Sequence, residues 1–247
     1  RYSVETVINN GQINMKDNSF GIIAKNVSLG GSSVLKLGKE GVGIYSKSST
    51  GTPSTLSFAA GSKIELESTT QDRPGVGVFT EGTDATTITA DGNMILGDNN
   101  YGIISKTPGS ITTGAGSNVT LGENTMYVVS ENGASITNNT TLTSDKNNVK
   151  VLYAKAGTIT NNADINLSGI GSIGIISDGG RATNTAGKII NVGKSDALNE
   201  KYSVGMAAIN GSIITNSGII NVKEESGIGM YATGVGSKAI NANTGVI

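Results

Sequence analysis

A six-residue segment of the form YGIISK, which stands at residues 101–106, recurs along nearly the whole chain. The copies are FGIIAK (20–25), VGIYSK (42–47), VGVFTE (76–81), YGIISK (101–106), MYVVSE (126–131), KVLYAK (150–155), IGIISD (173–178), VGMAAI (204–209) and IGMYAT (228–233). Most copies begin 22 to 25 residues after the previous one, and two intervals lengthen to 34 and 31 residues. A period of this length indicates one supersecondary unit that is stacked many times.

Each repeat contains three short segments with the pattern of a strand, and turn residues stand between them. In the repeat from 101, YGIISK is followed by SITT (110–113) and SNVTLG (117–122). The third signal alternates apolar and polar side chains, which is the period of a strand with one buried side. We therefore predict an all-β fold: a three-sided parallel β-helix of about nine to ten coils. Because the period is regular, residues 1–247 are expected to form a single segment.

Two columns of the repeated segment indicate which side chains face the core. The third position always carries a large apolar residue, and the fifth carries Ala, Ser or Thr. The sixth position alternates in sign, through Lys47, Glu81, Lys106, Glu131, Lys155 and Asp178. Coils spaced by about 4.8 Å would stack these charges into a ladder of opposite signs. The alternative is a set of ordinary charges on a solvated turn.

Asparagine forms a second column near the end of the middle strand signal. Its members are Asn9, Asn138, Asn161, Asn184 and Asn216. Stacked amides can hydrogen-bond along the long axis of such a fold. Asparagine also suits tight turns, so simple turn residues are an equal alternative.

Composition excludes several classes of function. The formal net charge is −1 and no basic run occurs, which argues against nucleic-acid binding. Cysteine and histidine are both absent, so disulfides, thiol nucleophiles and the commonest metal ligand are excluded, and we expect no metal or other cofactor. No apolar stretch is long enough for a spanning helix, so this segment itself should not contact a membrane. Because the chain starts with Arg1 and shows no signal pattern, we expect a segment of something longer.

Sequence motifs that suggest catalysis lack the context that each needs. Residues 169–174 match G-x-G-x-x-G, but a strand rather than a helix should follow them. Residues 193–195 resemble the end of a phosphate-binding loop without its first glycine. A glycosidase needs converging acids, and the candidates Glu65 with Glu67 and Glu224 with Glu225 have no third partner. We therefore predict no catalytic residues and no enzymatic activity.

The fourth position of the repeated segment is a candidate binding surface. If positions three and five face inward, position four faces outward, beside a column that is mostly glycine. This would form an apolar stripe with aromatic members Tyr45, Phe79, Tyr153 and Tyr231. Exposed apolar patches of this extent mark interaction sites. The alternative is that the strand bends, so that a flanking loop covers position four or a corner partly buries it.

Two long repeats carry insertions near residues 67–74 and 194–202. Loops inserted on one side of a solenoid often carry recognition, although a solenoid also tolerates idle insertions. The polar and aromatic residues in these insertions are the candidate contacts. They are Asp72, Arg73, Asn199, Glu200 and Tyr202.

Repeats of the GIIS, SITN and G-x-INL type, rich in Asn, Gly and Thr and without Cys, resemble passenger segments of the large type V autotransporter adhesins, above all the fusobacterial outer-membrane ones. The resemblance covers essentially the whole chain but rests on repeat style. It implies a right-handed parallel β-helix that extends from the bacterial outer membrane. A barrel outside this segment would anchor it.

Three functions follow as hypotheses. The first is a monomeric, non-enzymatic adhesin segment that binds a host-cell receptor protein or glycan, or partner bacteria. The second is a stiff stalk with no ligand of its own. The third is a secreted carbohydrate-active enzyme on the same fold. A stalk needs neither an exposed stripe nor two inserted loops, and an enzyme needs an acidic cluster.

Overall fold

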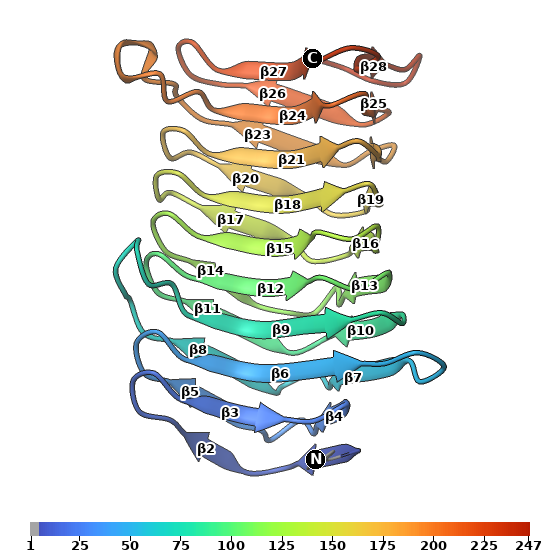
Figure 1. Cartoon of the computed structure of the whole chain (residues 1–247). Helices are drawn as coiled ribbons and strands as arrows, with labels where there is room; N and C mark the ends of the chain where they lie inside the picture. Colours follow the sequence, from blue (N-terminus) through green and yellow to red (C-terminus); the bar gives the residue numbers. More distant parts are fainter. Residues whose placement is uncertain (1–4) are drawn as a thin grey trace.

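The computed structural model describes residues 5–247, so residues 1–4 of the predicted segment lie outside the described part. This part of the chain is a stack of parallel strands with one short 3₁₀ turn, η1 (Ala197–Asn199). The nearest strands in Figure 1 run to the right while the chain rises from the N- to the C-terminus, so the coil is right-handed. The predicted right-handed parallel β-helix is confirmed.

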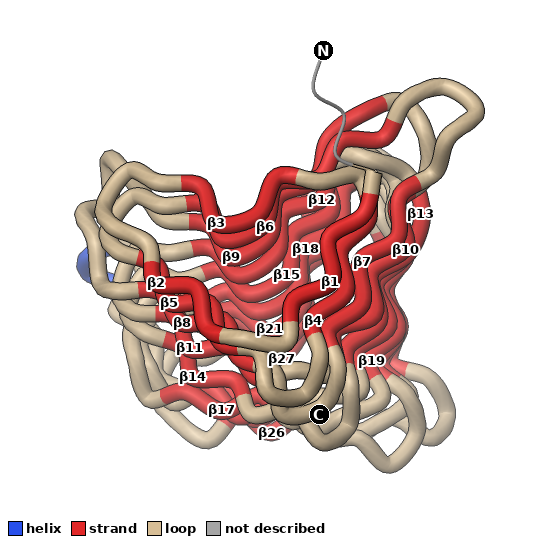
Figure 2. The backbone as a smooth tube through the Cα atoms, turned by 90° about the horizontal axis from the view of Figure 1, so that it is seen from below, coloured by secondary structure: helices blue, strands red, loops and turns tan. Residues whose placement is uncertain are grey.

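Four sheets form the three sides of the coil, as the view along the axis shows (Figure 2). The repeated six-residue segment forms the nine-stranded front sheet. Its strands are β3 (Phe20–Ile23), β6 (Val42–Ser48), β9 (Val76–Gly82), β12 (Tyr101–Ser105), β15 (Met126–Ser130), β18 (Lys150–Lys155), β21 (Ile173–Asp178), β24 (Val204–Ile209) and β27 (Ile228–Thr233).

The second strand of each coil belongs to a ten-stranded middle sheet. Its strands are β1 (Thr6–Asn9), β4 (Asn26–Leu29), β7 (Ser54–Phe58), β10 (Thr86–Ala90), β13 (Gly109–Thr113), β16 (Ser135–Asn138), β19 (Thr158–Asn161), β22 (Arg181–Asn184), β25 (Ile213–Asn216) and β28 (Lys238–Asn241). The third side is divided between two sheets. One contains β2 (Gln12–Asn14), β5 (Val34–Leu37), β8 (Lys63–Leu66), β11 (Asn93–Leu96) and β14 (Val119–Leu121), and the other β17 (Leu142–Ser144), β20 (Ile165–Leu167), β23 (Ile189–Val192) and β26 (Ile219–Val222).

Like positions of successive coils lie in register, and this builds the core. Ile103 pairs with Val78 on one side and Val128 on the other, and all three are essentially inaccessible to solvent. The small fifth-position residues Ser105 and Ser130 stack in the same way and are also buried. Large and small columns therefore alternate across one narrow interior, as the sequence predicts.

The second position of the front strand, which is glycine in most coils, faces the core. The expectation that this glycine column lies on the outside, beside the stripe, is wrong. The ladder pairs Tyr101 with Met126 and Ile103 with Val128 but omits Gly102, so the second position turns inward like the third. A Cβ atom on Gly102 would lie 2.5 Å from the carbonyl oxygen of Tyr127 and 2.9 Å from the sulfur of Met94. Glycine is needed here because the next coil approaches closely. The outward columns are consequently positions one, four and six.

The predicted asparagine ladder exists in the C-terminal half of the stack, where its amides are buried. Asn138 donates to Asn161 at 2.8 Å, and Asn161 donates to Asn184 at 2.9 Å. The ladder continues through Asn216 to Asn241, which the sequence analysis did not include. Asn9 is not a member, because its register partner is Leu29 and this column is apolar near the N-terminus. The amides satisfy one another, which removes the cost of burying them.

The division of the third side coincides with a change in core packing. Between β14 and β17 the ladder is interrupted, while the front and middle sheets continue across. In the same region the glycine column carries Tyr127, whose side chain is almost fully buried, and the apolar third-strand column carries Ser144. Ser144 donates its hydroxyl proton to the carbonyl of Leu121 across the interruption. A large side chain on the front strand thus accompanies a small one on the third strand.

Candidate functional site

The charged column on the front sheet stacks in register. Lys47 forms an ion pair with Glu81 at 3.3 Å, and Lys106 forms one with Glu131 at 3.4 Å. Lys155 is the register partner of Asp178, but the two side chains do not form an ion pair. The Asp178 carboxylate instead accepts a hydrogen bond from the hydroxyl of Tyr153 at 2.8 Å. The column is therefore partly an ion ladder and partly a set of tyrosine–carboxylate contacts.

The fourth-position stripe is neither fully exposed nor fully covered. Tyr45 and Phe79 stack with their ring centroids 6.0 Å apart, and the ammonium of Lys106 lies 5.5 Å from the Phe79 centroid. Tyr231, in the last coil, is 45% exposed, and Tyr153 is half-buried. The pKa of Tyr45 and that of Tyr153 are both raised to about 12, and burial is the largest cause. The hydrogen bond from Tyr45 to Glu81 and the one from Tyr153 to Asp178 act in the same direction.

Glu81 couples the stripe to the charged column, and this predicts a pH effect. The hydrogen bond from Tyr45, followed by that from Lys47, holds the pKa of Glu81 below its ordinary value of 4.5. A carboxyl whose pKa is lowered in the folded state stabilises the protein at pH values above its pKa in the unfolded state. This stabilisation is lost as the pH falls through the folded pKa.

We expect Glu81→Gln to reduce the free energy of unfolding near neutral pH. The gap to the native protein should narrow as the pH falls below 4.5 and through the lower folded pKa of Glu81. Chemical denaturation at neutral pH and in this acidic range measures the gap. The matched control is Glu123→Gln, which changes an exposed carboxyl on a turn. An equal gap for Glu81→Gln at both pH values would contradict the role of its charge.

The two insertions lie on the same side of the stack, at the corner that precedes the front sheet (Figure 1). In the first, Arg73 forms an ion pair with Glu40 at 3.2 Å, and Asp72 is exposed. A further loop, which sequence analysis did not identify, is the turn at residues 49–53, and it projects on the opposite side.

The second insertion is held by its own hydrogen bonds. The Asp196 carboxylate accepts a bond from the backbone N–H of Asn199 and a bond from its side chain. The side-chain bond from Asn199 lowers the pKa of Asp196. Glu200 is exposed and Tyr202 is 44% exposed, while Leu198 at the tip is 96% exposed. Leu198 was not among the residues predicted to make contacts.

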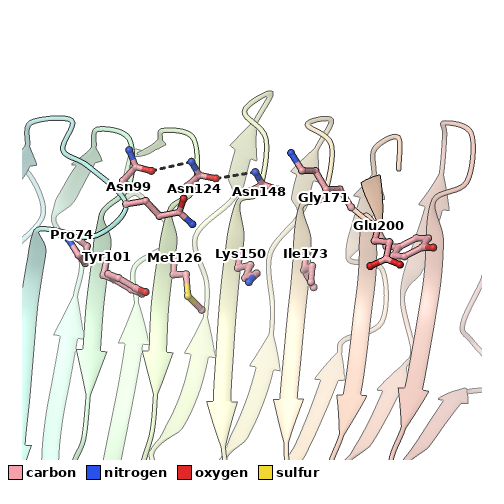
Figure 3. A pocket seen from close by; sticks show the side chains of 13 residues that line it. Pro74, Asn99, Tyr101, Asn124, Met126, Asn148, Lys150, Gly171, Ile173 and Glu200 are labelled. Atoms are coloured by element: carbon pink, nitrogen blue, oxygen red, sulfur yellow. Dashed lines mark hydrogen bonds between the residues drawn. The ribbon is translucent and has the colours of Figure 1, made fainter. Parts of the chain in front are cut away.

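A groove of about 560 Å³ lies between the two insertions. Pro74 lies at one end and Glu200 at the other (Figure 3), and Gln71, Lys201 and Tyr202 from the same insertions also line the groove. The groove therefore brings together parts of the chain that are more than a hundred residues apart. It does not include Asp72, Arg73 or Asn199.

The wall and the floor of the groove come from regular coil positions. Asn124 donates to Asn99 at 3.0 Å and Asn148 donates to Asn124 at 2.9 Å, which forms a ladder of amides along the wall (Figure 3). The first position of each front strand forms the floor. Its residues here are Tyr101, Met126, Lys150 and Ile173.

The sequence contains a signal for this wall that the sequence analysis did not use. Asn99, Asn124 and Asn148 each stand two residues before a front strand, and their φ angles are +62°, +54° and +56°. Asparagine tolerates this left-handed conformation better than other residues with a side chain. The recurrence of Asn at this offset marks a turn whose side chains project in a row.

The groove continues into the aromatic stripe. A second hollow of about 350 Å³ is lined by Phe79, Ile104, Val129 and Tyr153, and it shares Tyr101 and Met126 with the groove. Two of the predicted stripe residues thus lie on a surface that is continuous with the space between the insertions. Tyr45 and Tyr231 do not line either hollow.

None of the acidic candidates for catalysis lines the groove, and Glu65 and Glu67 line a separate hollow of about 490 Å³ on the third side of the coil. Glu65 forms ion pairs with Lys63 at 3.0 Å and Lys36 at 3.5 Å, and although burial acts to raise its pKa, these lysines hold it below the ordinary value. Glu224 and Glu225 are exposed, and Glu225 lies 3.8 Å from Lys194. Across residues 5–247, no cluster of three or more acidic side chains is arranged to hold a metal ion.

Comparison with known proteins identifies the family. The sequence model of the BigA third pectate lyase-like domain matches residues 46–247, which is most of the chain. The chain belongs to this family. Membership indicates a bacterial surface protein and agrees with the β-helix of this pectate lyase-like domain. No curated protein and no solved structure matches the chain. In residues 5–247, no helix has the length and apolar character needed to span a membrane.

Proposed function

We propose that this pectate lyase-like domain is a non-enzymatic segment of a surface adhesin, exported as the passenger of a type V autotransporter through the outer membrane. It attaches the bacterium to host cells or to other bacteria through protein or glycan contacts. The observation that carries this proposal is the groove that both insertions close. A stalk gains nothing from two loops that converge on one hollow, whereas a binding segment does.

The lining of the groove supports a binding role over a catalytic one. Lysine side chains neutralise Glu65, and the groove contains a single carboxylate, that of Glu200. Hydrolysis of a glycosidic bond requires two carboxyl groups on opposite sides of the bond. The groove therefore has the features of a recognition surface rather than of an active site.

The experiment replaces the two insertions, singly and together, and measures attachment. Residues 67–74 and 194–202 are each replaced by the short turn of a regular coil, and binding of the purified domain to a panel of host cells and bacteria is compared with the native domain. We expect the double replacement to lose at least about tenfold in affinity. The matched control shortens the turn at residues 49–53, on the opposite side, and should bind like the native domain.

Two results would overturn the proposal. If neither the native domain nor any variant binds the panel, the segment is a stalk. If shortening the turn at 49–53 abolishes attachment while the double replacement does not, the binding surface lies on the other side of the stack.

A further inference from the structure

The floor of the groove offers an approaching ligand side chains and no open strand edge. The strands that form its floor, β12, β15, β18 and β21, are each paired in parallel with a neighbour on both sides. Their backbone N–H and C=O groups are therefore used within the front sheet. An extended peptide could not add to this surface by strand pairing, and its own amides would lose water without a backbone partner.

The wall of the groove suits a ligand rich in hydroxyl groups. The amide nitrogen of Asn124 donates to Asn99, and that of Asn148 donates to Asn124. Each amide nitrogen carries a second N–H and each amide oxygen a second lone pair, so the row can both donate to and accept from a ligand. Sugar hydroxyls have the same dual capacity. The apolar parts of Tyr101, Met126 and Ile173 on the floor can contact the C–H faces of sugar rings.

A single cation stands in the middle of the floor. The first position of the front strand is otherwise apolar, with Met126 and Ile173 as the register partners of Lys150. Among residues 5–247, no carboxylate forms an ion pair with Lys150. Its side chain is half-buried. An uncompensated charge of this kind attracts a carboxylate from a ligand.

The length of the groove limits the size of the ligand. The floor crosses the four coils that carry Tyr101, Met126, Lys150 and Ile173, which at about 4.8 Å per step is roughly 14 Å. The insertion with Pro74 closes one end and that with Tyr202 closes the other. This space fits a short oligosaccharide or the end of a glycan chain.

We propose that the groove binds a short oligosaccharide that carries one carboxylate, with Lys150 as the residue that recognises the carboxylate. The Asn99–Asn124–Asn148 row binds the hydroxyl groups, and the floor holds the rings. This inference rests on the proposed adhesive function and names its ligand. A sialic acid and a hexuronic acid share the required carboxylate, and the probes below distinguish them.

The test measures affinity of the domain for three soluble probes. These are sialyllactose, lactose as its neutral counterpart, and a disaccharide that contains glucuronic acid. We expect at least one acidic probe to bind about tenfold more tightly than lactose. Lys150→Gln should abolish this preference. The matched control is Lys155→Gln, which makes the same change at the far end of the same strand and should keep the preference.

Each outcome decides the inference. Preference for sialyllactose or for the glucuronic acid disaccharide, lost only in Lys150→Gln, supports it and identifies the acid. Equal binding of acidic and neutral probes, or an unchanged preference in Lys150→Gln, overturns it. If no probe binds but the native domain still attaches to cells through its insertions, the adhesive function stands and the glycan inference fails.

Discussion

Replacement of Ile103 by Asp is expected to abolish cooperative folding of the coils around it. The Ile103 side chain is fully buried between Val78 and Val128. A carboxylate at this place would lose its water with no cation or donor to compensate, and the cost adds to the lost apolar burial. We expect a loss of more than about 4 kcal/mol in the free energy of unfolding. Because each coil depends on its neighbours, β-structure should disappear over several coils.

Far-ultraviolet circular dichroism and thermal unfolding measure this loss. The matched control is Ile95→Asp, since Ile95 lies on the outward side of the third face and is 37% exposed. We expect that variant to keep the native spectrum. If Ile103→Asp also kept it, the inward assignment of the third position would be wrong.

Replacement of Tyr127 by Gly is expected to have the second largest effect, although it restores the residue that most other coils carry at that position. The Tyr127 side chain is almost fully buried, and burial raises the pKa of its hydroxyl above the ordinary value. Removal of a buried aromatic ring leaves a cavity that its surroundings fill only in part, at a cost of about 3–5 kcal/mol. We expect the unfolding free energy to fall by this amount.

The control for this variant is Tyr127→Phe. It keeps the ring and removes only the hydroxyl, which bonds with Thr140, so a loss of about 1 kcal/mol is expected. Denaturant unfolding of the two variants separates the stability that comes from the volume of the ring from the stability that comes from the hydrogen bond of the hydroxyl. Equal stability of Tyr127→Gly and Tyr127→Phe would show that the ring does not fill the core.

The stacking of coils could be predicted because its cause is local and repeated. Ile103 and its counterparts recur at one position of one short strand, and a side-chain period of two places them all on the same side. Asn161 and Asn184 could be aligned for the same reason. Asn9 could not, because its place in the column depends on its pairing with Leu29, which sequence spacing alone does not fix.

The orientation of the glycine column could not be predicted, for a physical reason. Strict alternation of side chains assumes that every residue of a strand joins the ladder. Gly102 leaves the ladder, so two successive residues turn inward and the outward columns are positions one, four and six. Only the backbone geometry reveals this, because Gly102 itself has no side chain whose polarity would mark its side.

The groove was only partly predictable. The two insertions and two of the stripe residues, Phe79 and Tyr153, were identified from the sequence. The hollow that Phe79 and Tyr153 line shares Tyr101 and Met126 with the groove that the insertions close. The contribution of Lys150 was not, because in the sequence it is one lysine among many. Its significance comes from the floor of apolar neighbours on either side and from the absence of an ion-pair partner within the described residues. Both are properties of the stacked arrangement.

Site-specific photo-crosslinking tests most directly whether the groove is the surface that holds a ligand. A photoreactive side chain is placed at Met126, on the floor of the groove, or at Ile95, on the third face. After irradiation on host cells or partner bacteria, we expect a covalent adduct from position 126 and none from position 95. Adducts from position 95 alone, or none from position 126 under conditions in which the domain attaches to those cells, would contradict a binding site between the two insertions.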